Sequence, residues 1–387
     1  MCIRDRLKTY YAKQIFLSDR ILENGYLTVE DGRIKSITDK KPSDTEIVSF
    51  EDKIIAPGLV DLHIHGLYSH DVMDNDKNGM LTISEKLPSC GVTSYFPTTL
   101  TSDRKTLKAV SKTVYEVSKI KNGAKIQGIF YEGPFFTQKH KGAQNEKYMT
   151  DPDINVFNEW KDELHELAIR IGIAPERKGA AKFVKEAIKE GVIVGIGHSD
   201  ATYDEAKECL DNGASFFVHT YNGMSGLNSR KPGMVGAALS YDHVYSELIC
   251  DGHHVHPASC KIVMKCRGKD EIIFVTDCMR AGGMGNCISK LGEFDVIVKD
   301  GQARLKNGGN LAGSVLELKN AVKNVVEWGF LTPFEAVKAA SYNPAKSVGK
   351  EDEFGQLKEK MPADFIVLDD DMNLILTYVD GVKKYEK

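Results

Sequence analysis

Residues 56–66 decide the fold of this chain and read APGLVDLHIHG. From Leu59 to Ile64 the residues alternate as in a β-strand, where side chains two residues apart point to the same face. His63 and His65 are therefore expected on one face, and Gly66 ends the strand. Two imidazoles on one face can bind one metal ion, because zinc accepts histidine nitrogens at about 2.0–2.1 Å. The alternative is a pair of histidines on a half-buried strand, and the rest of the chain must decide between them.

Length and composition exclude several classes of function. The 387 residues allow two or three domains, or an α/β barrel with an added unit. The net charge of -4 gives no electrostatic reason to expect nucleic acid or an anionic membrane as a partner. No apolar run approaches the ~20 residues of a membrane span. The 8 cysteines are scattered without a Cys-x-x-Cys pair, so we expect reduced thiols and a cytoplasmic protein.

The first six residues are charged and lead into no apolar segment, so they are not typical of a secretory signal. They also fit no pattern that follows, and we expect them to be foreign to the native domain.

Strand and helix patterns alternate through the middle of the chain. Candidate strands lie at 59–65, 93–98, 125–131, 168–174, 192–197, 215–218, 245–249 and 271–276. Helical patterns lie at 102–119, 178–190, 202–212, 257–265, 315–329 and 333–341. Eight strands that alternate with helices predict a (β/α)8 barrel of the TIM type. An inserted hairpin is expected at 291–305, with its turn at 299–301.

Both ends of the chain are rich in strand patterns. Asp31-Gly32 and Asp380-Gly381 are strong hairpin-turn signals between alternating segments. We therefore expect a small β-sandwich built from both termini. The predicted division is 1–56 and 351–387 for the two parts of this sandwich and 57–350 for the barrel.

Polar residues follow five of the eight predicted strands. Besides the first strand, the chain places Glu132, His198, His219 and Asp277 directly after apolar strands. The carboxyl ends of barrel strands meet at one face, where the chemistry of such barrels sits. Any one of these residues is also compatible with a core histidine or a solvated acid, but five equivalent positions favour a shared site.

These residue types indicate a metal-dependent hydrolase. Histidine nitrogens and carboxylate oxygens suit zinc, iron, manganese or cobalt. Glu132 is placed to bridge two ions, with His63 and His65 on one and His198 and His219 on the other. Two such ions would activate a shared water. Asp277 would accept its proton and pass it to a leaving group. Hydrolysis of an amide or an ester is the natural reaction.

The motifs resemble those of a known family. Residues 57–66 resemble the first-strand motif of the amidohydrolase superfamily, which combines a metal-bearing barrel with a small β-sandwich. More specific are the motifs YEGPFF at 131–136, GHSDA at 197–201 and HTYNGM at 219–224, together with DGHHV at 251–255, VTD at 275–277 and LAGS at 311–314. These are similar to the N-acetylglucosamine-6-phosphate deacetylases, over essentially residue 7 to the C-terminus.

The resemblance implies roles for individual residues. Glu132, His198 and His219 match the constant metal ligands, and His63 and His65 match an extra pair found in members that hold a second ion. Asp277 matches the catalytic acid and base. The resemblance further implies these substrate-binding residues: Ala143 and Gln144, Asn222 and Gly223 at the sugar phosphate, Arg230 from a partner subunit of a homodimer, His254 at the phosphate or sugar, and Leu311 and Ala312 at the acetyl group.

One position departs from the family pattern. Many members have a histidine where this chain has Gln144, and that histidine contacts substrate. Gln144 can donate a hydrogen bond but carries no charge. His140 lies nearby but out of register, so we do not assign it this role, and the sequence does not decide which side chain polarises the substrate.

Four hypotheses remain for the function. The first is a deacetylase of N-acetylglucosamine 6-phosphate, with no nucleic acid or membrane partner, and the second is the same reaction on the galacto epimer. The third is a cyclic-amide or N-acyl-amino-acid hydrolase. Its cyclic-amide form is disfavoured, because many such members bridge two metals with a carboxylated lysine and residues 171–176 contain none. The fourth is a barrel that has lost catalysis and serves as a scaffold, against which the full set of polar residues argues.

Overall fold

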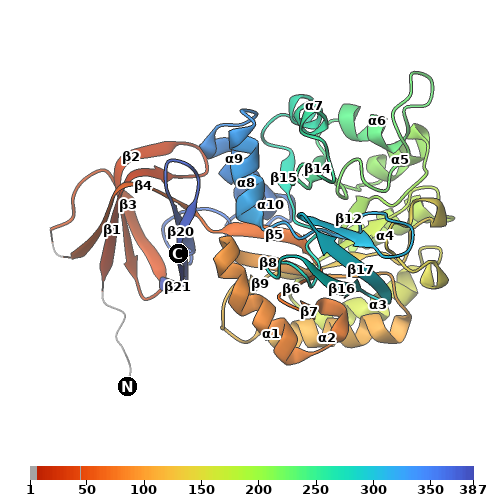
Figure 1. The fold of residues 1–387 in the computed structure, drawn as a ribbon, viewed down its shortest axis with the longest axis horizontal. Coiled ribbons are helices and arrows are strands. Elements are labelled where there is room, and N and C mark those ends of the chain that lie inside the picture. Colours follow the sequence, from red (N-terminus) through yellow and green to blue (C-terminus); the bar gives the residue numbers. More distant parts are fainter. Residues whose placement is uncertain (1–6, 44) are drawn as a thin grey trace.

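The computed structural model describes residues 7–43 and 45–387. The chain forms a small β domain beside a larger barrel, with the two lying side by side along the longest axis (Figure 1). The expectation that residues 1–6 are foreign to the domain lies outside the described residues.

The small β domain unites both ends of the chain, as predicted. Its seven strands form one sheet in the order β21 (Val382–Glu386), β20 (Leu374–Val379), β19 (Phe365–Leu368), β4 (Glu46–Pro57), β1 (Lys8–Phe16), β2 (Ile21–Glu30) and β3 (Arg33–Thr38). The predicted turns at Asp31-Gly32 and Asp380-Gly381 are confirmed, and all four residues have positive φ. That conformation is the one a tight two-residue hairpin requires.

The sheet of the small domain curls around its own core. Tyr10 on β1 and Tyr378 on β20 are three strand spacings apart in the sheet order, which would be about 14 Å in a flat sheet. Their ring centroids are 5.2 Å apart. Phe365 on β19 packs between them, at 5.1 Å from Tyr10 and 4.3 Å from Tyr378. The predicted sandwich is therefore a single curved sheet that encloses an aromatic core.

The barrel prediction is confirmed. Its parallel strands follow the order β5 (Leu59–Ile64), β8 (Val92–Thr99), β10 (Gly128–Glu132), β11 (Ala168–Ile173), β12 (Ile193–Ile196), β13 (Phe216–Phe217), β14 (Tyr245–Leu248) and β15 (Ile272–Phe274), with β9 (Lys125–Ile126) beside β8. Each lies within or close to a predicted strand. We propose the same division into domains, with boundaries near residues 56 and 350.

Contacts after β15 bring the last strand back to the first. The Asp277 N–H donates to the carbonyl of His63 at 2.9 Å, and the His65 N–H donates to the carbonyl of Cys278 at 2.9 Å. Beneath them, the Thr276 hydroxyl donates to Asp61 at 2.6 Å. These bonds place His63 and His65 beside Asp277, which lies more than 200 residues later in the sequence.

Helices cover the outside of the barrel (Figure 1). They are α1 (Lys77–Lys86), α2 (Arg104–Ser118), α3 (Ile154–Lys161), α4 (Ala180–Lys189), α5 (Tyr203–Asp211), α6 (Gly233–Ser240), α7 (Pro257–Arg267), α8 (Leu318–Glu327), α9 (Pro333–Ala339) and α10 (Tyr342–Ser347). Short 3₁₀ turns lie at Val72–Asp74, Leu87–Cys90, Gln138–His140, Glu146–Tyr148 and Asp162–Leu164. The six predicted helices are confirmed. Four helices, α1, α3, α6 and α10, were not predicted. α6 escaped prediction because its sequence GMVGAALS is small, apolar and mostly buried, without the one-sided pattern of a surface helix.

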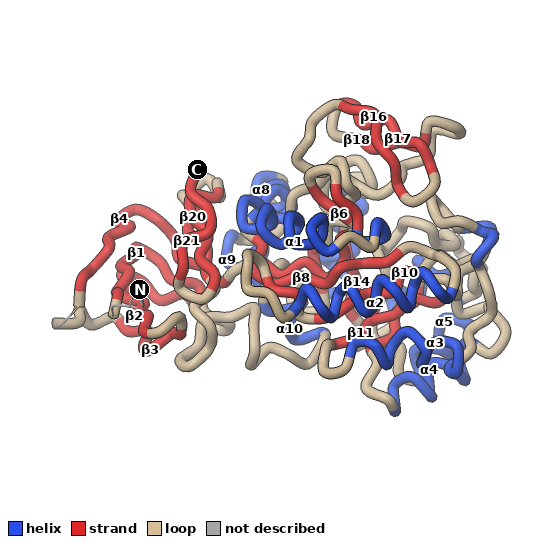
Figure 2. Tube along the Cα trace, turned by 90° about the horizontal axis from the view of Figure 1, so that it is seen from below, coloured by secondary structure: helices blue, strands red, loops and turns tan. Residues whose placement is uncertain are grey.

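The insertion after β15 is larger than predicted. The hairpin turn at 299–301 is confirmed between β17 (Phe294–Lys299) and β18 (Gln302–Leu305), but β16 (Cys287–Leu291) adds a third antiparallel strand. This sheet stands apart from the barrel strands in Figure 2. β16 was missed because one of its two apolar branched residues, Ile288, is 81% exposed and disturbs the expected alternation. Near the mouth of the barrel, β6 (Gly66–Leu67) and β7 (His70–Asp71) form a further short hairpin.

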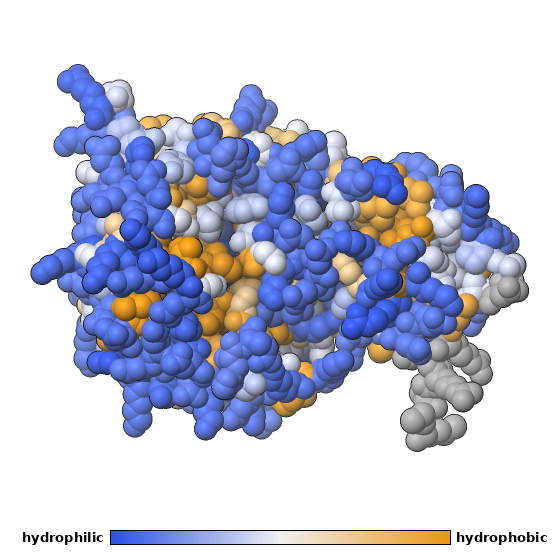
Figure 3. Space-filling view, turned by 180° about the vertical axis from the view of Figure 1, so that it is seen from behind, coloured by the Kyte–Doolittle hydropathy of each residue, from blue (hydrophilic) through white to orange (hydrophobic). Residues whose placement is uncertain are grey.

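The surface is mostly hydrophilic, as the balanced content of charged residues in the sequence suggests. Seen from behind, hydrophilic residues predominate, and apolar residues show in patches between them (Figure 3). Each of the seven cysteines in the described part of the chain is free. No helix in residues 7–43 and 45–387 is long and apolar enough to cross a membrane.

Candidate active site

Glu132, His198 and His219 meet at the carboxyl ends of their strands. Oε1 of Glu132 lies 3.1 Å from Nε2 of His198 and 3.0 Å from Nε2 of His219, and the two nitrogens are 3.0 Å apart. Tetrahedral ligands at about 2.0–2.1 Å from a zinc ion are separated by about 3.3 Å. The three atoms are therefore spaced almost as ligands of one small cation would be.

His63, His65 and Asp277 form a second group that also meets Glu132. Oδ1 of Asp277 lies 3.1 Å from Nε2 of His65 and 3.6 Å from Nε2 of His63. The second oxygen of Glu132, Oε2, lies 3.2 Å from Nε2 of His65. Nε2 of His63 is buried and has no hydrogen-bond partner, and its lone pair could instead coordinate a bound cation. Each group brings three ligand atoms within 4.8 Å of one another, so the residues fit one or two metal ions.

Unusual backbone conformations aim three of these side chains. His198, His219 and Asp277 have φ values of 45°, 27° and 50°. Residues other than glycine rarely adopt this left-handed region, and such strain costs about 1–3 kcal/mol per residue and clusters at functional sites. Each lies two or three residues beyond the end of an apolar strand, so the sharp change of direction turns its side chain across the barrel mouth.

The electrostatics of the site favour a cation. Burial alone would lower the pKa of His63 and His65, but the facing carboxylates outweigh it. They raise the pKa of His63 well above its ordinary value and that of His65 to about 9. Burial would raise the pKa of Glu132 and Asp277, yet the histidines hold both below their usual range. The carboxylates thus stay charged, and a metal ion would take the place of the protons on the imidazoles.

The outer nitrogens of two histidines are fixed by main-chain carbonyls. Nδ1 of His65 donates to the carbonyl of Thr98 at 3.1 Å, and Nδ1 of His198 donates to the carbonyl of His140 at 2.7 Å. Such partners fix the tautomer that leaves Nε2 free for a metal.

Most of the predicted site residues line one cavity of about 140 Å³. These are His65, Glu132, Ala143, Gln144, His198, His219, Asn222, Gly223, His254, Asp277 and Leu311. His63 and Ala312 are fully buried behind its wall. Leu291 on β16 also lines it, a contribution that the sequence did not indicate.

Arg230 is the exception among the predicted residues. It is exposed, at the tip of a short hairpin closed by the pairing of Asn228 with Lys231, and it does not line this cavity. The hairpin belongs to the green loop that projects beside α6 in Figure 1.

Gln144 faces the metal-holding residues, whereas the ring of His140 points away from them. The Gln144 amide donates to Oε2 of Glu132 at 2.5 Å and accepts from the Thr101 N–H at 2.7 Å. The His140 ring instead turns to Asp200, at 3.0 Å. Gln144 therefore orients the shared carboxylate, which is a role that a neutral amide can fill.

His254 is held by a neighbouring acid. Its Nδ1 donates to Asp251 at 2.6 Å, and Asp251 also accepts from the main-chain N–H groups of His253 and His254 at 2.8 Å. This leaves Nε2 of His254 as the ring nitrogen available to the cavity.

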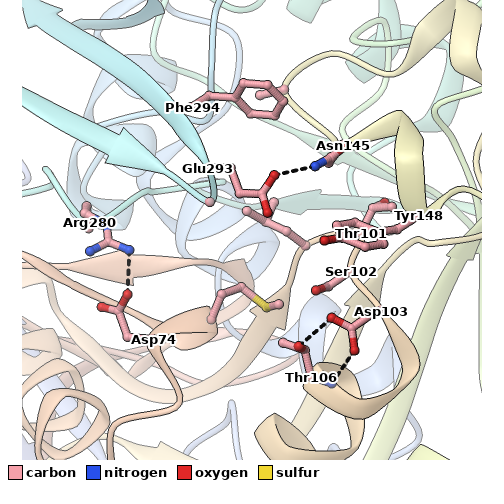
Figure 4. A pocket seen from close by; sticks show the side chains of 14 residues that line it. Asp74, Thr101, Ser102, Asp103, Thr106, Asn145, Tyr148, Arg280, Glu293 and Phe294 are labelled. Carbon is pink, nitrogen blue, oxygen red and sulfur yellow. Dashed lines mark hydrogen bonds and ion pairs between the residues drawn. The ribbon is translucent and has the colours of Figure 1, made fainter.

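A second cavity of about 250 Å³ adjoins the first, and Leu100 and Ala143 line both. Two pairs of its polar residues contact each other: Arg280 with Asp74 at 2.8 Å and Asn145 with Glu293 at 2.6 Å (Figure 4). The second pair ties the loop that carries Gln144 to the turn between β16 and β17. It therefore connects two segments that each contribute a residue, Gln144 and Leu291, to the lining of the active-site cavity.

Two charged residues in the barrel interior were missed. Arg170 on β11 and Glu247 on β14 are fully buried, and Glu247 contacts Nδ1 of His63 at 3.3 Å. They lie inside strands rather than at strand ends, where the search for ligands was made. A charged residue in an otherwise apolar parallel strand is itself a signal, because such residues are almost never fully buried unless paired.

Comparisons with known proteins find a family model, curated relatives and solved structures that are similar to this chain. The model of the amidohydrolase family matches residues 54–384. The N-acetylglucosamine-6-phosphate deacetylase of Vibrio furnissii is 37% identical over 331 residues, which cover 84% of this chain and 82% of that protein. The N-acetylgalactosamine-6-phosphate deacetylase of Escherichia coli O157:H7 is 33% identical over 372 residues, covering 96% and 97%. One solved structure that matches is that of a mutant N-acetyl-D-glucosamine-6-phosphate deacetylase from Mycobacterium smegmatis in complex with N-acetyl-D-glucosamine-6-phosphate. The two structures superpose with a TM-score of 0.93 at 25% sequence identity, and the match covers 98% of this chain and 99% of that chain.

Substitutions in the two metal-holding groups are expected to change the metal content differently. His198→Ala or His219→Ala should remove the ion held with Glu132 and abolish hydrolysis, because each leaves only two ligands. Replacing both His63 and His65 by alanine should cost at most one ion. Elemental analysis of protein purified without chelators measures both. A wild-type protein free of transition metal, after growth with ample metal, would contradict the site.

Proposed function

The chain belongs to the amidohydrolase family, and we propose that it removes the acetyl group of N-acetylglucosamine 6-phosphate. The C–N bond of the amide is cleaved, the hydroxyl of a water molecule goes to the acetyl carbon, and the products are acetate and glucosamine 6-phosphate. One observation carries the proposal: Glu132 joins two metal-holding groups at a cavity that also contains Asp277. The relatives at 31–37% identity over most of the chain support the substrate class.

The metal site supplies the chemistry that an amide requires. Glu132, His198 and His219 would hold one divalent ion, and His63, His65 and Asp277 a second. When bound, such an ion supplies Lewis-acid activation of water and of the amide carbonyl. Zinc and iron are our first choices for this donor set, with manganese and cobalt as alternatives.

Asp277 is the proton carrier in this proposal. Its carboxylate is buried and is kept ionised by His65 and His63. It can therefore accept a proton from the attacking water and deliver it to the amine nitrogen as the C–N bond breaks. Asp277 belongs to the second metal-holding group and also lines the cavity, where a bound substrate would present its acetyl carbon.

The remaining cavity residues are proposed to bind the sugar phosphate. Asn222, Gly223 and His254 would contact the phosphate or sugar. Leu311, with Ala312 behind it, would form the wall at the acetyl group. Ala143 lines the cavity beside Gln144, which shapes the site through its bond to Glu132.

The galacto epimer is the second candidate substrate. The relative from Escherichia coli O157:H7 that matches 96% of this chain acts, by its name, on N-acetylgalactosamine 6-phosphate. Acetate release from both 6-phosphates, measured side by side, decides between them. A higher kcat/KM for the gluco form is the expected result, and a higher value for the galacto form would reassign the substrate.

We further propose a cytoplasmic homodimer. Free cysteines suit a reducing compartment. Arg230 is exposed and does not line the cavity of its own subunit, which suits a role at a neighbouring subunit. Its planar guanidinium matches a phosphate group with two parallel hydrogen bonds.

Asp277→Asn tests the proton carrier. Asparagine keeps the shape but cannot accept the proton, so kcat for acetate release should fall by about 10²–10⁴-fold. Metal content should fall by at most one ion. Asp103→Asn, at the N-cap of α2 in the neighbouring cavity, is the matched control and should keep near wild-type turnover. Near-normal kcat in the Asp277 variant would remove this residue from the role.

Arg230→Ala tests the composite phosphate site. Loss of charge-assisted hydrogen bonds should lower kcat/KM for the 6-phosphate sugar by a factor on the order of 10². The poorer rate on unphosphorylated N-acetylglucosamine should hardly change. Lys231→Ala, next to it in the same hairpin, should behave like the wild type.

Subunit exchange makes this test decisive. A mixed dimer of Arg230→Ala and Asp277→Asn chains contains one site with an intact Asp277 from the first chain and an intact Arg230 from the second. Activity should therefore reappear on mixing. A monomeric protein, or no recovery after verified exchange, would refute the shared site.

A further inference from the structure

A buried ion pair crosses the barrel interior beneath the candidate metal site. Arg170 on β11 donates through Nη2 to Oε1 of Glu247 on β14 at 2.5 Å, and through Nη1 to the carbonyl of Leu62 on β5 at 2.9 Å. Its guanidinium also lies 3.9 Å from the ring centroid of Phe216 and 4.9 Å from that of Phe130. Arg170 and Glu247 are both fully buried.

Such a pair is a poor device for stability alone. Removing two charges from water carries a large desolvation penalty, and apolar replacements of similar volume often stabilise a protein as well or better. A function for the pair should therefore be visible in what else its charged groups contact.

The second carboxylate oxygen of Glu247, which does not contact Arg170, faces the metal site. Oε2 accepts from Nδ1 of His63 at 3.3 Å and from the main-chain N–H of His219 at 3.2 Å. A carboxylate paired with a guanidinium only accepts hydrogen bonds, so Nδ1 of His63 must carry a proton. Nε2 of the same ring is then the nitrogen that faces Glu132 at 3.5 Å and Asp277 at 3.6 Å, without a hydrogen-bond partner of its own.

His63 differs in this respect from the other histidines of the site. The outer nitrogens of His65 and His198 meet neutral main-chain carbonyls. Nδ1 of His219 has no hydrogen-bond partner among the described residues. A charged acceptor orients an imidazole and raises its strength as a ligand more than a neutral one does.

We propose that Glu247, anchored by Arg170, is a positioning residue that fixes His63 with Nδ1 protonated and Nε2 turned to the second metal-holding group, and that it thereby sets the affinity of that group for its ion. The inference rests on the metal site of the proposed function but not on its substrate. It assigns the pair to the ion of His63, His65 and Asp277 rather than to the ion of Glu132, His198 and His219.

Glu247→Gln is the informative variant. The amide keeps the shape, but its NH₂ must face either the donors of Arg170 or those of His63 and His219, so one side places a donor against a donor. Turned to His63, it favours the tautomer with a proton on Nε2, which cannot bind a metal. The main-chain bond from the Thr220 N–H to the carbonyl of Glu247 is unaffected by this change.

The measurement is metal affinity, ion by ion. Purified wild-type, Glu247→Gln and His63→Ala/His65→Ala proteins are titrated with Zn²⁺ in chelator buffers, and the ion that the double alanine variant lacks is the His63-dependent one. Glu247→Gln should bind that ion about 10–100-fold more weakly. It should retain the other ion with unchanged affinity. After loading with Co²⁺, the visible absorption of the His63-dependent ion should change in Glu247→Gln, which reports a change in its coordination.

A matched control separates positioning from general loss of stability. Asp364→Asn removes a different buried carboxylate, one that pairs with Lys125 at 2.8 Å far from the site, and should leave both affinities unchanged. If Glu247→Gln does not fold, Arg170→Lys carries the test. It keeps the charge but loses the fork that reaches both Leu62 and Glu247, and should weaken the same ion by a smaller factor.

Three results would overturn the proposal. The first is wild-type affinity for the His63-dependent ion in a folded Glu247→Gln protein, and the second is an equal loss of both ions in that protein. The third is a double alanine variant that binds as many ions as the wild type, because no ion would then depend on His63. Each of these results leaves acetate release by the wild type untouched, so a failure here is distinct from a failure of the proposed function.

Discussion

The site depends on one buried carboxylate that several imidazoles share. Glu132 is 2% exposed, and its two oxygens face His198 and His219 on one side and His65 on the other. An unpaired charge at this depth would cost far more than the fold can supply. The histidines therefore have to converge from different strands, and the parallel barrel is the architecture that brings their carboxyl ends together.

Bringing these ligands together costs conformational and electrostatic free energy, and particular residues of the site carry that cost. His198, His219 and Asp277 take up strained backbone conformations, and His63 and His65 hold protons more tightly than isolated histidines do. A metal ion among the ligands would account for both the strained conformations and the raised histidine pKa values. The ion would replace the protons on the imidazoles, and its binding would offset the cost of the strained backbone. Main-chain carbonyls, Gln144 and Glu247 then act as the outer layer that aims each ligand.

Much of the fold and of the site was predictable from the sequence. The period of two from Leu59 to Ile64, and the position of Glu132, His198, His219 and Asp277 after apolar strands, lead to the barrel and to its ligands because parallel strands end at one face. The turns at Asp31 and Asp380 were predictable because Asp-Gly tolerates positive φ.

Other parts of the structure depend on contacts that no local pattern carries. Arg170 and Glu247 sit within strands and are 77 residues apart, so only the closed barrel shows that they pair. β16 has an exposed isoleucine, and it is held as a strand by its antiparallel pairing with β17. The orientation of Gln144 toward Glu132 follows from the fold of its loop, and the sequence alone did not decide whether Gln144 or the out-of-register His140 faces the site.

The most direct test of the account is anomalous diffraction from crystals of the protein loaded with zinc. The account predicts a strong anomalous peak within bonding distance of Glu132, His198 and His219, and with full loading a second peak among His63, His65 and Asp277 on the other side of the same carboxylate. An ordered structure with zinc bound only elsewhere, or with Glu132 in contact with no ion, would contradict it.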